Sequence, residues 1–223
     1  KDFEETVVTV KDPVGGKCSL TGEVVLTGTP IKDKVLATYP QLTTNATGCA
    51  TPDATNYTYM GGCYLKGAQT NNYIWYNGFL WRIMGINADG TVKMITEENV
   101  TVIPYNAANT NFEGSYADKW LNDYFYNNLD ASKKVIANGN FCQGLAVTTA
   151  PSNTTCTGTT LSKKIGLLTI DEYNLAGMGG SYLNTIQVFW TMSPYDASNA
   201  WCVSDSGNSN ATQLPTRTAF AQL

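Results

Sequence analysis

The stretch NNYIWYNGFLWRIMGINADGTVKMIT, residues 71–96, decides the fold. The dipeptides Asn77-Gly78 and Asp89-Gly90 divide it into three runs of aromatic and β-branched residues: 72–76, 79–87 and 91–96. Asn-Gly and Asp-Gly between alternating apolar residues are the strongest short-range signals of β-hairpins. The stretch therefore predicts a three-stranded antiparallel meander.

Two helices are predicted further along the chain. Residues 116–129 carry apolar side chains at helical spacing after Ser115, a plausible N-cap residue. Thr169 and Glu172 form a T-x-x-E capping box for a short helix over 170–176, which Gly177 ends. Hairpins followed by helices and further strands are typical of the α+β class.

The other elements are shorter. A helical piece is expected over 30–39 and a polar loop over 40–62, and the remaining β-branched runs predict strands over 3–10, 19–27, 164–169, 187–191 and 200–204. We expect an N-terminal β-rich segment over 1–62 and a main α+β domain over 63–223. In that domain, antiparallel hairpins pack with one main amphipathic helix and short helices.

The composition excludes several functions. The chain has 223 residues, a net charge of −4, 14% charged residues and no histidine. A triad or zinc site that uses histidine is therefore impossible within it, and the acidic balance argues against nucleic-acid binding. No cofactor motif is present, and we expect a protein that is not an enzyme.

Six cysteines without a CxxC pair favour disulfides and an oxidising compartment. Two pairs have the same spacing of fourteen positions and bracket polar loops. The predicted bonds are Cys49–Cys63, Cys142–Cys156 and, between the two cysteines that remain, Cys18–Cys202. The alternative is that the cysteines are buried free thiols.

Aromatic side chains are the first candidates for a binding site. Six of them are suited to a stacking platform, and packing in the core explains them equally well; they are Trp75, Tyr76, Trp81, Trp190, Tyr195 and Trp201. Core packing is favoured for Trp81, Trp120 and Trp190. The loops over 193–212 are the predicted ligand site, with Tyr195, Asp196, Asn199, Trp201, Asp205 and Asn208.

Carboxylates are the second candidates. Asp196, Asp205, Asn199 and Asn208 offer oxygen ligands for calcium, but turn formation explains them better, so no metal is predicted. Asp171-Glu172 and Glu97-Glu98 are the acid pairs available to a hydrolase. Helix capping explains Glu172, and solvation explains Glu97-Glu98, so hydrolysis is the least favoured function.

Four stretches resemble a known family: residues 71–96, SYADKWLNDYFYNNL (115–129), KIGLLTIDEYNLAG (164–177) and FWTMSPYDASNAWCVSDSG (189–207). They are similar to a bacterial extracellular domain of unknown function from surface-anchored and pilin-like proteins of Gram-positive gut bacteria. That family in turn is distantly similar to the C-type-lectin and formylglycine-generating-enzyme-like fold. The resemblance implies an outer-surface location and no catalytic residues.

Together these observations predict a non-enzymatic extracellular surface protein, either an adhesin or a pilus-type subunit. The alternative is a C-type-lectin-like module that binds a glycan or protein through the 193–212 loops. The expected partners are other surface-protein or filament subunits, or a glycan or protein of a host or cell surface. No apolar run of 18 residues is present, so we expect no membrane contact by these residues and attachment through a segment outside this chain.

Overall fold

The computed structural model describes residues 5–10, 20–25, 30–107, 109–131, 136–208, 213–215 and 219–221. The chain divides into two compact units, Lys1–Pro40 and Gln41–Leu223. The predicted boundary after residue 62 would separate strand β5 (Asn56–Tyr59) from most of strand β6 (Gly62–Leu65). These two strands pair with each other within the second unit.

The described residues of the first unit form two strands and a helix. β1 (Glu5–Val10) pairs antiparallel with β2 (Leu20–Val25), so that Glu5 faces Val25. Helix α1 spans Ile31–Thr38. The predictions of strands near both positions and of a helical piece after Pro30 are confirmed.

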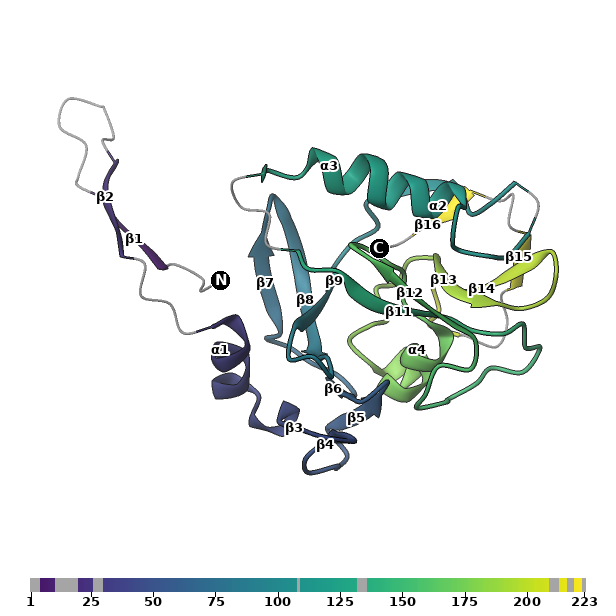
Figure 1. Cartoon of the computed structure of the whole chain (residues 1–223), viewed down its shortest axis with the longest axis horizontal. Coiled ribbons are helices and arrows are strands. Elements are labelled where there is room, and N and C mark those ends of the chain that lie inside the picture. The colour runs from purple at the N-terminus through teal and green to yellow at the C-terminus, as the bar shows by residue number, and fades with distance from the viewer. Residues whose placement is uncertain are drawn as a thin grey trace. The chain divides into compact units, whose positions relative to one another are not determined.

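The predicted meander is the centre of the second unit. β7 (Tyr73–Tyr76), β8 (Phe79–Ile86) and β9 (Val92–Thr96) form it, with β8 between the other two. Asn77 and Gly78 both have positive φ (53° and 86°), as a two-residue type I′ turn requires. β6 and β5 extend the same sheet in the order β5-β6-β8-β7, and β7 is one of its edge strands (Figure 1).

Residues 40–62 are more structured than the predicted polar loop. A 3-10 turn, η1 (Pro40–Leu42), is followed by β3 (Thr44–Asn45), β4 (Gly48–Cys49) and β5. Polar side chains hold these pieces: the amide of Asn56 donates to the carbonyl oxygens of Gln41 and Thr51. A loop prediction based on polarity was wrong here because side-chain amides supply the hydrogen bonds that order the backbone.

The main helix is confirmed, but its middle turn is π-helical, which is wider than the predicted α-helix. It comprises α2 (Tyr116–Lys119), a π-helical turn η2 (Trp120–Phe125) and α3 (Tyr126–Asn128). Ser115 caps it by accepting the N–H of Asp118 at 2.9 Å. The amide of Asn122 donates to the carbonyl oxygen of Asp118 and so competes with the regular α-helical bond at that position.

The second half of the chain adds small sheets around α4 (Ile170–Ala176). β10 (Thr101–Pro104) pairs with β16 (Ala219–Ala221), and β11 (Gly139–Gln143) pairs with β12 (Thr159–Lys163). β13 (Phe189–Pro194), β14 (Asn199–Val203) and β15 (Gln213–Pro215) form a three-stranded sheet. A short 3-10 turn, η4 (Met178–Gly180), follows α4.

One predicted strand in this region is wrong. β12 ends at Lys163, and residues 164–169 form no strand. The side chain of Asn122 accepts the N–H of Ile165 and donates to its carbonyl oxygen, so a side-chain amide replaces the neighbouring strand. The capping box that follows is confirmed, because Thr169 and Glu172 exchange both of its bonds.

The core lies between the sheets and α4. Its largest fully buried side chains come from many elements and include Trp190, Trp201, Tyr59, Tyr105, Tyr173, Phe112, Phe189, Leu42, Leu65, Met84, Ile86 and Ile170. The predicted disulfides Cys49–Cys63 and Cys142–Cys156 are both present. The third, Cys18–Cys202, includes a residue outside the described part of the chain.

The two disulfides indicate an oxidising environment such as the exterior of the cell. Within the described residues, none of the helices has the length and hydropathy needed to cross a membrane.

Candidate functional site

Four of the six predicted ligand residues lie on one hairpin, β13–β14, and the other two lie beyond its end. Asp196 and Asn199 form its turn: the Asp196 carboxylate accepts the N–H of Ser198 at 2.7 Å and that of Asn199 at 2.8 Å. It also accepts the side-chain amide of Asn199 at 2.7 Å, and chiefly this last bond holds the pKa of Asp196 below its ordinary value. In this structure, the Asp196 carboxylate therefore stabilises the turn.

Trp201 and Tyr195 pack against each other with ring centroids 5.1 Å apart. Trp201 is only 1% exposed, and its indole N–H donates to the carbonyl oxygen of Val147 at 2.9 Å. Its ring therefore lies in the core and supports Tyr195, which is half-buried. Of the two, only Tyr195 has a surface that a ligand can reach.

Asp205 and Asn208 lie beyond the far end of β14 from the turn, and both are exposed. The four steps along β14 correspond to roughly 13 Å. The hairpin therefore does not bring the four predicted oxygen ligands together. In the described part of the chain, no three acidic or cysteine side chains are grouped so as to hold a metal.

Three of the four acidic residues considered for hydrolysis form structural bonds, and the fourth, Glu98, is exposed. Glu97 pairs with Arg82, and Glu172 completes the capping box and pairs with Lys93. Asp171 accepts the N–H of Asn153, and burial raises the pKa of its carboxyl group. Neighbouring helix residues do not face each other, so Asp171 and Glu172 do not form a facing acid pair.

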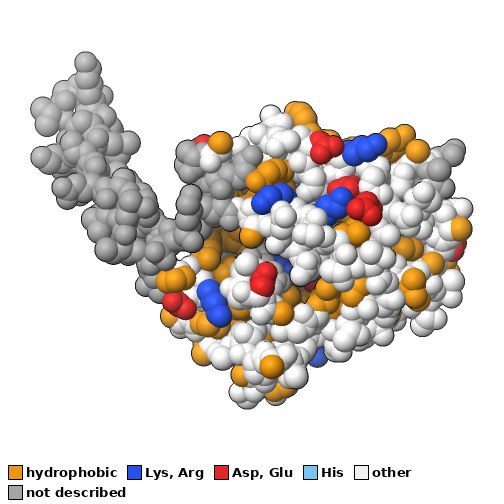
Figure 2. All heavy atoms as spheres, viewed as in Figure 1, with side chains coloured by type: hydrophobic (Ala, Val, Ile, Leu, Met, Phe, Trp, Pro, Cys, Tyr) orange, Lys and Arg blue, Asp and Glu red, His pale blue; other side chains and the backbone are white. Residues whose placement is uncertain are grey.

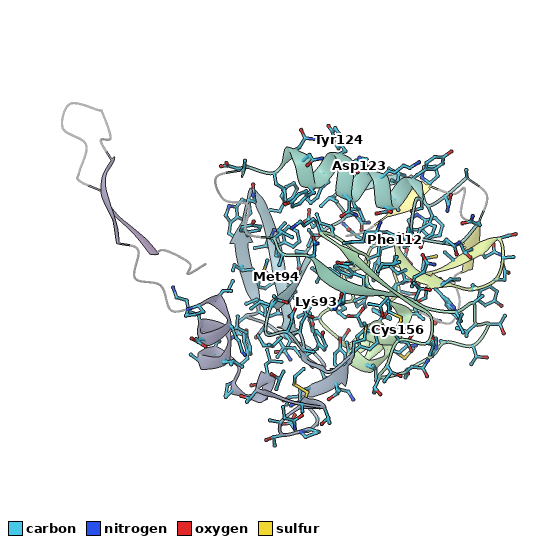
Figure 3. All side chains as sticks on the ribbon, viewed as in Figure 1. Lys93, Met94, Phe112, Asp123, Tyr124 and Cys156 are labelled. Atoms are coloured by element: carbon cyan, nitrogen blue, oxygen red, sulfur yellow. A yellow bond between two sulfur atoms is a disulfide. The ribbon has the colours of Figure 1, made fainter. Side chains whose placement is uncertain are left out.

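An ion pair of Lys93 and Glu172 joins β9 to α4, and Figure 3 labels Lys93 on β9. The Glu172 side chain is almost fully buried, and the Lys93 amino group lies 5.5 Å from the ring centroid of Phe141 and 5.7 Å from that of Tyr64. Burial, reinforced by the Glu172 charge, raises the pKa of the Tyr64 hydroxyl. These contacts assign a structural role to the pair.

A different hairpin, β7–β8, carries two exposed aromatic rings. Trp75 is 71% exposed, Tyr73 41% and Leu80 38%. Tyr73 and Trp75 lie two positions apart on β7, and Leu80 is opposite Trp75 on β8, so the three side chains share one side of the sheet. We call these three residues the β7–β8 face.

Arg82 holds Tyr73 in place. Its guanidinium group lies 3.9 Å from the centroid of the Tyr73 ring and pairs with both oxygens of Glu97, at 2.5 and 3.2 Å. The same group donates to the Asn72 side chain and to the carbonyl oxygen of Gln69. The Tyr73 ring is therefore fixed by a saturated, charge-balanced network, which lowers the entropy that it loses on binding.

Charge is sparse on the molecule, and Figure 2 shows the few acidic and basic side chains scattered among uncharged groups. The three residues of the β7–β8 face are uncharged, and Arg82, which is opposite Tyr73 on the same side of the sheet, is paired with Glu97. A rigid tyrosine, an exposed tryptophan and a leucine suit the binding of an apolar or ring-shaped surface, because Trp and Tyr dominate contact energies. The face has no group suited to acid–base chemistry.

The sequence singled out Trp75 as one of six platform candidates and missed Tyr73 and Leu80. The signal available for Tyr73 was its two-residue spacing from Trp75 in a predicted strand. Strand alternation indicates which side chains share a side, but exposure depends on which strand lies at the sheet edge.

Residues 89–220 match a protein family described as "Domain of unknown function (DUF6273)", and the match covers more than half of the chain. The chain belongs to the DUF6273 family. The resemblance to a domain of unknown function is thereby confirmed, and the family description assigns no activity. The match includes the β13–β14 hairpin and begins after β8. No curated protein and no solved structure matches this DUF6273 chain.

Proposed function

We propose that this DUF6273 chain is a non-enzymatic binding module of an extracellular bacterial surface protein, an adhesin or filament subunit. In this proposal it makes contact through the β7–β8 face. The observation that carries the proposal is the 71% exposure of Trp75 beside a tyrosine that an arginine network holds rigid. An exposed apolar patch of this kind typically marks an interaction site.

The two disulfides and the low charge support the same role. Disulfides persist outside the reducing cytosol, and two of them are present in the described part of the chain. The engagement of Glu97, Asp171 and Glu172 in structural bonds supports a function without acid–base catalysis.

A bead-adhesion assay tests the proposal. The full chain is coupled to fluorescent beads, which are applied to mucin-coated glass and to epithelial cell layers. We expect Trp75→Ala to weaken adhesion about tenfold or more, because truncation of an aromatic hot spot costs about 2 kcal/mol or more. Tyr124→Ala is the matched control, since Tyr124 is 59% exposed and lies on a different element, η2.

The proposal fails if beads with the unchanged chain adhere neither to these two surfaces nor to one another. It fails equally if Trp75→Ala beads adhere as well as unchanged ones.

The second candidate is a lectin-like module that binds glycan at the β13–β14 turn. This candidate is favoured by the half-buried Tyr195 ring, which packs against Trp201. The polar pair of Asp196 and Asn199 follows Tyr195 in the same turn. In the same assay this candidate predicts that Tyr195→Ala abolishes adhesion to mucin and that Trp75→Ala does not.

A further inference from the structure

The outer edge of β7 presents backbone groups as well as aromatic rings. In a two-residue hairpin the residues beside the turn, here Tyr76 and Phe79, exchange two hydrogen bonds, and the pattern alternates from there. Ile83 donates to the carbonyl oxygen of Asn72 at 2.7 Å, in agreement with this register. The backbone groups of Ile74 and Tyr76 therefore point toward β8.

The backbone N–H and carbonyl groups of Tyr73 and Trp75 point the other way, toward the sheet edge. Leu80, which is opposite Trp75, uses its carbonyl oxygen for the N–H of Glu97 on the β9 side, as the alternation requires. Within the part of the chain that the structure describes, no backbone hydrogen bond to Tyr73 or Trp75 is formed. Tyr73 and Trp75 therefore contribute both exposed rings and the outward-pointing backbone groups of the sheet edge.

We infer that β7 is a docking strand for the β7 of a second copy of this chain, paired antiparallel about a two-fold axis at Ile74. This inference rests on the proposed function, because it names the partner of the β7–β8 face. Strand addition to an open sheet edge is a common mode of protein recognition.

The edge is self-complementary in this register. Tyr73 and Trp75 lie on either side of Ile74, so the two-fold axis places each Tyr73 opposite Trp75 of the other copy. Each copy contributes four outward-pointing backbone groups, and together the two copies form four hydrogen bonds across the axis. Two Tyr–Trp pairs result on the exposed side of the sheet, and cross-strand aromatic pairs are among the stabilising ones.

The charge of the edge also favours a second copy. The chain carries a net charge of −4, yet β7 has the sequence YIWY and contains no charged residue. The nearest charge, Arg82, is neutralised by Glu97. Two identical edges therefore meet without like-charge repulsion, and β7 lacks the lysine, proline or bulge that usually protects an edge strand.

The contact is small, because β7 has four residues and the β7–β8 face has three. Interfaces well below the usual 1,200–2,000 Å² are weak or transient. A weak contact is sufficient between molecules that are held at high local density on a surface, because their effective concentration is high.

A cysteine trap tests the register. Ile74 lies on the axis, where the α-carbons of a non-hydrogen-bonded pair are about 4.5 Å apart, within disulfide range. Under mild oxidation the full chain with Ile74→Cys is expected to give at least ten times more reducible dimer than the full chain with Tyr124→Cys. Equal dimer yields from the two variants overturn the inference.

Sedimentation of the full chain without added cysteine provides the second measurement, at roughly 10 μM to 1 mM, the range of a weak contact. We expect concentration-dependent dimers that Trp75→Lys weakens at least tenfold and Tyr124→Lys leaves unchanged. A monomer throughout this range, or a dimer insensitive to Trp75→Lys, overturns the inference.

The two failures are distinguishable. If the chain stays monomeric while its adhesion to mucin or cells depends on Trp75, the second copy is the wrong partner and the proposed function stands. If neither adhesion nor self-association depends on Trp75, both fail.

Discussion

The hairpins β7–β8 and β13–β14 are both rich in aromatic residues and have opposite roles. Trp75 on β7 is 71% exposed, whereas Trp190 on β13 and Trp201 on β14 are at most 1% exposed. All six residues of β13 are buried, because α4 and the loop closed by Cys142–Cys156 lie against that hairpin. β7 is at the edge of its sheet.

The difference shows that the position of a strand determines the role of its aromatic side chains. A tryptophan in an enclosed hairpin contributes to stability, and one on an edge strand is available for contact. Aromatic content alone would assign both hairpins the same function. The following changes separate stability from contact in the two hairpins.

The largest effect is expected from truncating a tryptophan in each hairpin. Trp201→Ala should lower the free energy of unfolding by about 3–5 kcal/mol, because it leaves a large cavity and an unpaired Val147 carbonyl group. Trp75→Ala should change it by less than about 0.5 kcal/mol. Urea unfolding measures both, and equal losses would contradict the contrast between the hairpins.

The disulfide over β13–β14 should have the next largest effect. Replacing Cys142 and Cys156 together by serine removes a bond that closes a loop of 14 positions, at a cost of about 3 kcal/mol. Val147 in that loop binds both Pro194 and the Trp201 indole, so the indole N–H of Trp201 should then exchange with solvent faster. Indole exchange at Trp75, resolved by NMR in the same sample, serves as the internal control and should not change.

A smaller effect is expected from one hydroxyl group in each hairpin. Ser193 on β13 accepts the buried N–H of Ile170 at 3.0 Å, and Ser193→Ala should cost about 1–2 kcal/mol because that donor is left unpaired. Tyr73→Phe removes a hydroxyl group that water can replace, since the ring is 41% exposed. Thermal unfolding should separate the two variants, and a larger loss for Tyr73→Phe would reverse the assigned roles.

The smallest effect should come from Asp196 and should depend on pH. Its pKa is lowered from 3.8, so the ionised form is favoured in the folded state. Its contribution to stability is therefore present above pH 3.8 and is lost as the pH falls through the lowered pKa. The difference in melting temperature between the unchanged chain and Asp196→Asn should narrow over that acidic range, and a constant difference would argue against the carboxylate turn.

Local signals predicted most of the elements. The turns at Asn77-Gly78 and Asp89-Gly90 and the capping box at Thr169 and Glu172 depend on neighbouring residues only, and all were confirmed. The equal spacing of four cysteines identified two disulfides. These features are local because backbone conformation and short loop closure determine them.

Features held by distant side chains could not be predicted. Asn122 lies 43 positions from Ile165 and replaces a strand partner there, so the predicted strand over 164–169 is absent. Burial of Trp201 depends on Val147, which lies 54 positions away. The candidate site differs for the same reason, because the sheet order that exposes Trp75 is a property of the whole unit.

Residue-resolved amide hydrogen exchange at increasing protein concentration tests the central claim, that the β7 edge is the contact surface of this chain. The amides of Tyr73 and Trp75 should exchange rapidly in dilute protein and become protected as the concentration rises. The amide of Ile74, which already bonds to β8, and those of Ser198 and Asn199 in the β13–β14 turn should not change. Protection that rises in the 193–199 turn, while Tyr73 and Trp75 stay unprotected, would contradict the account.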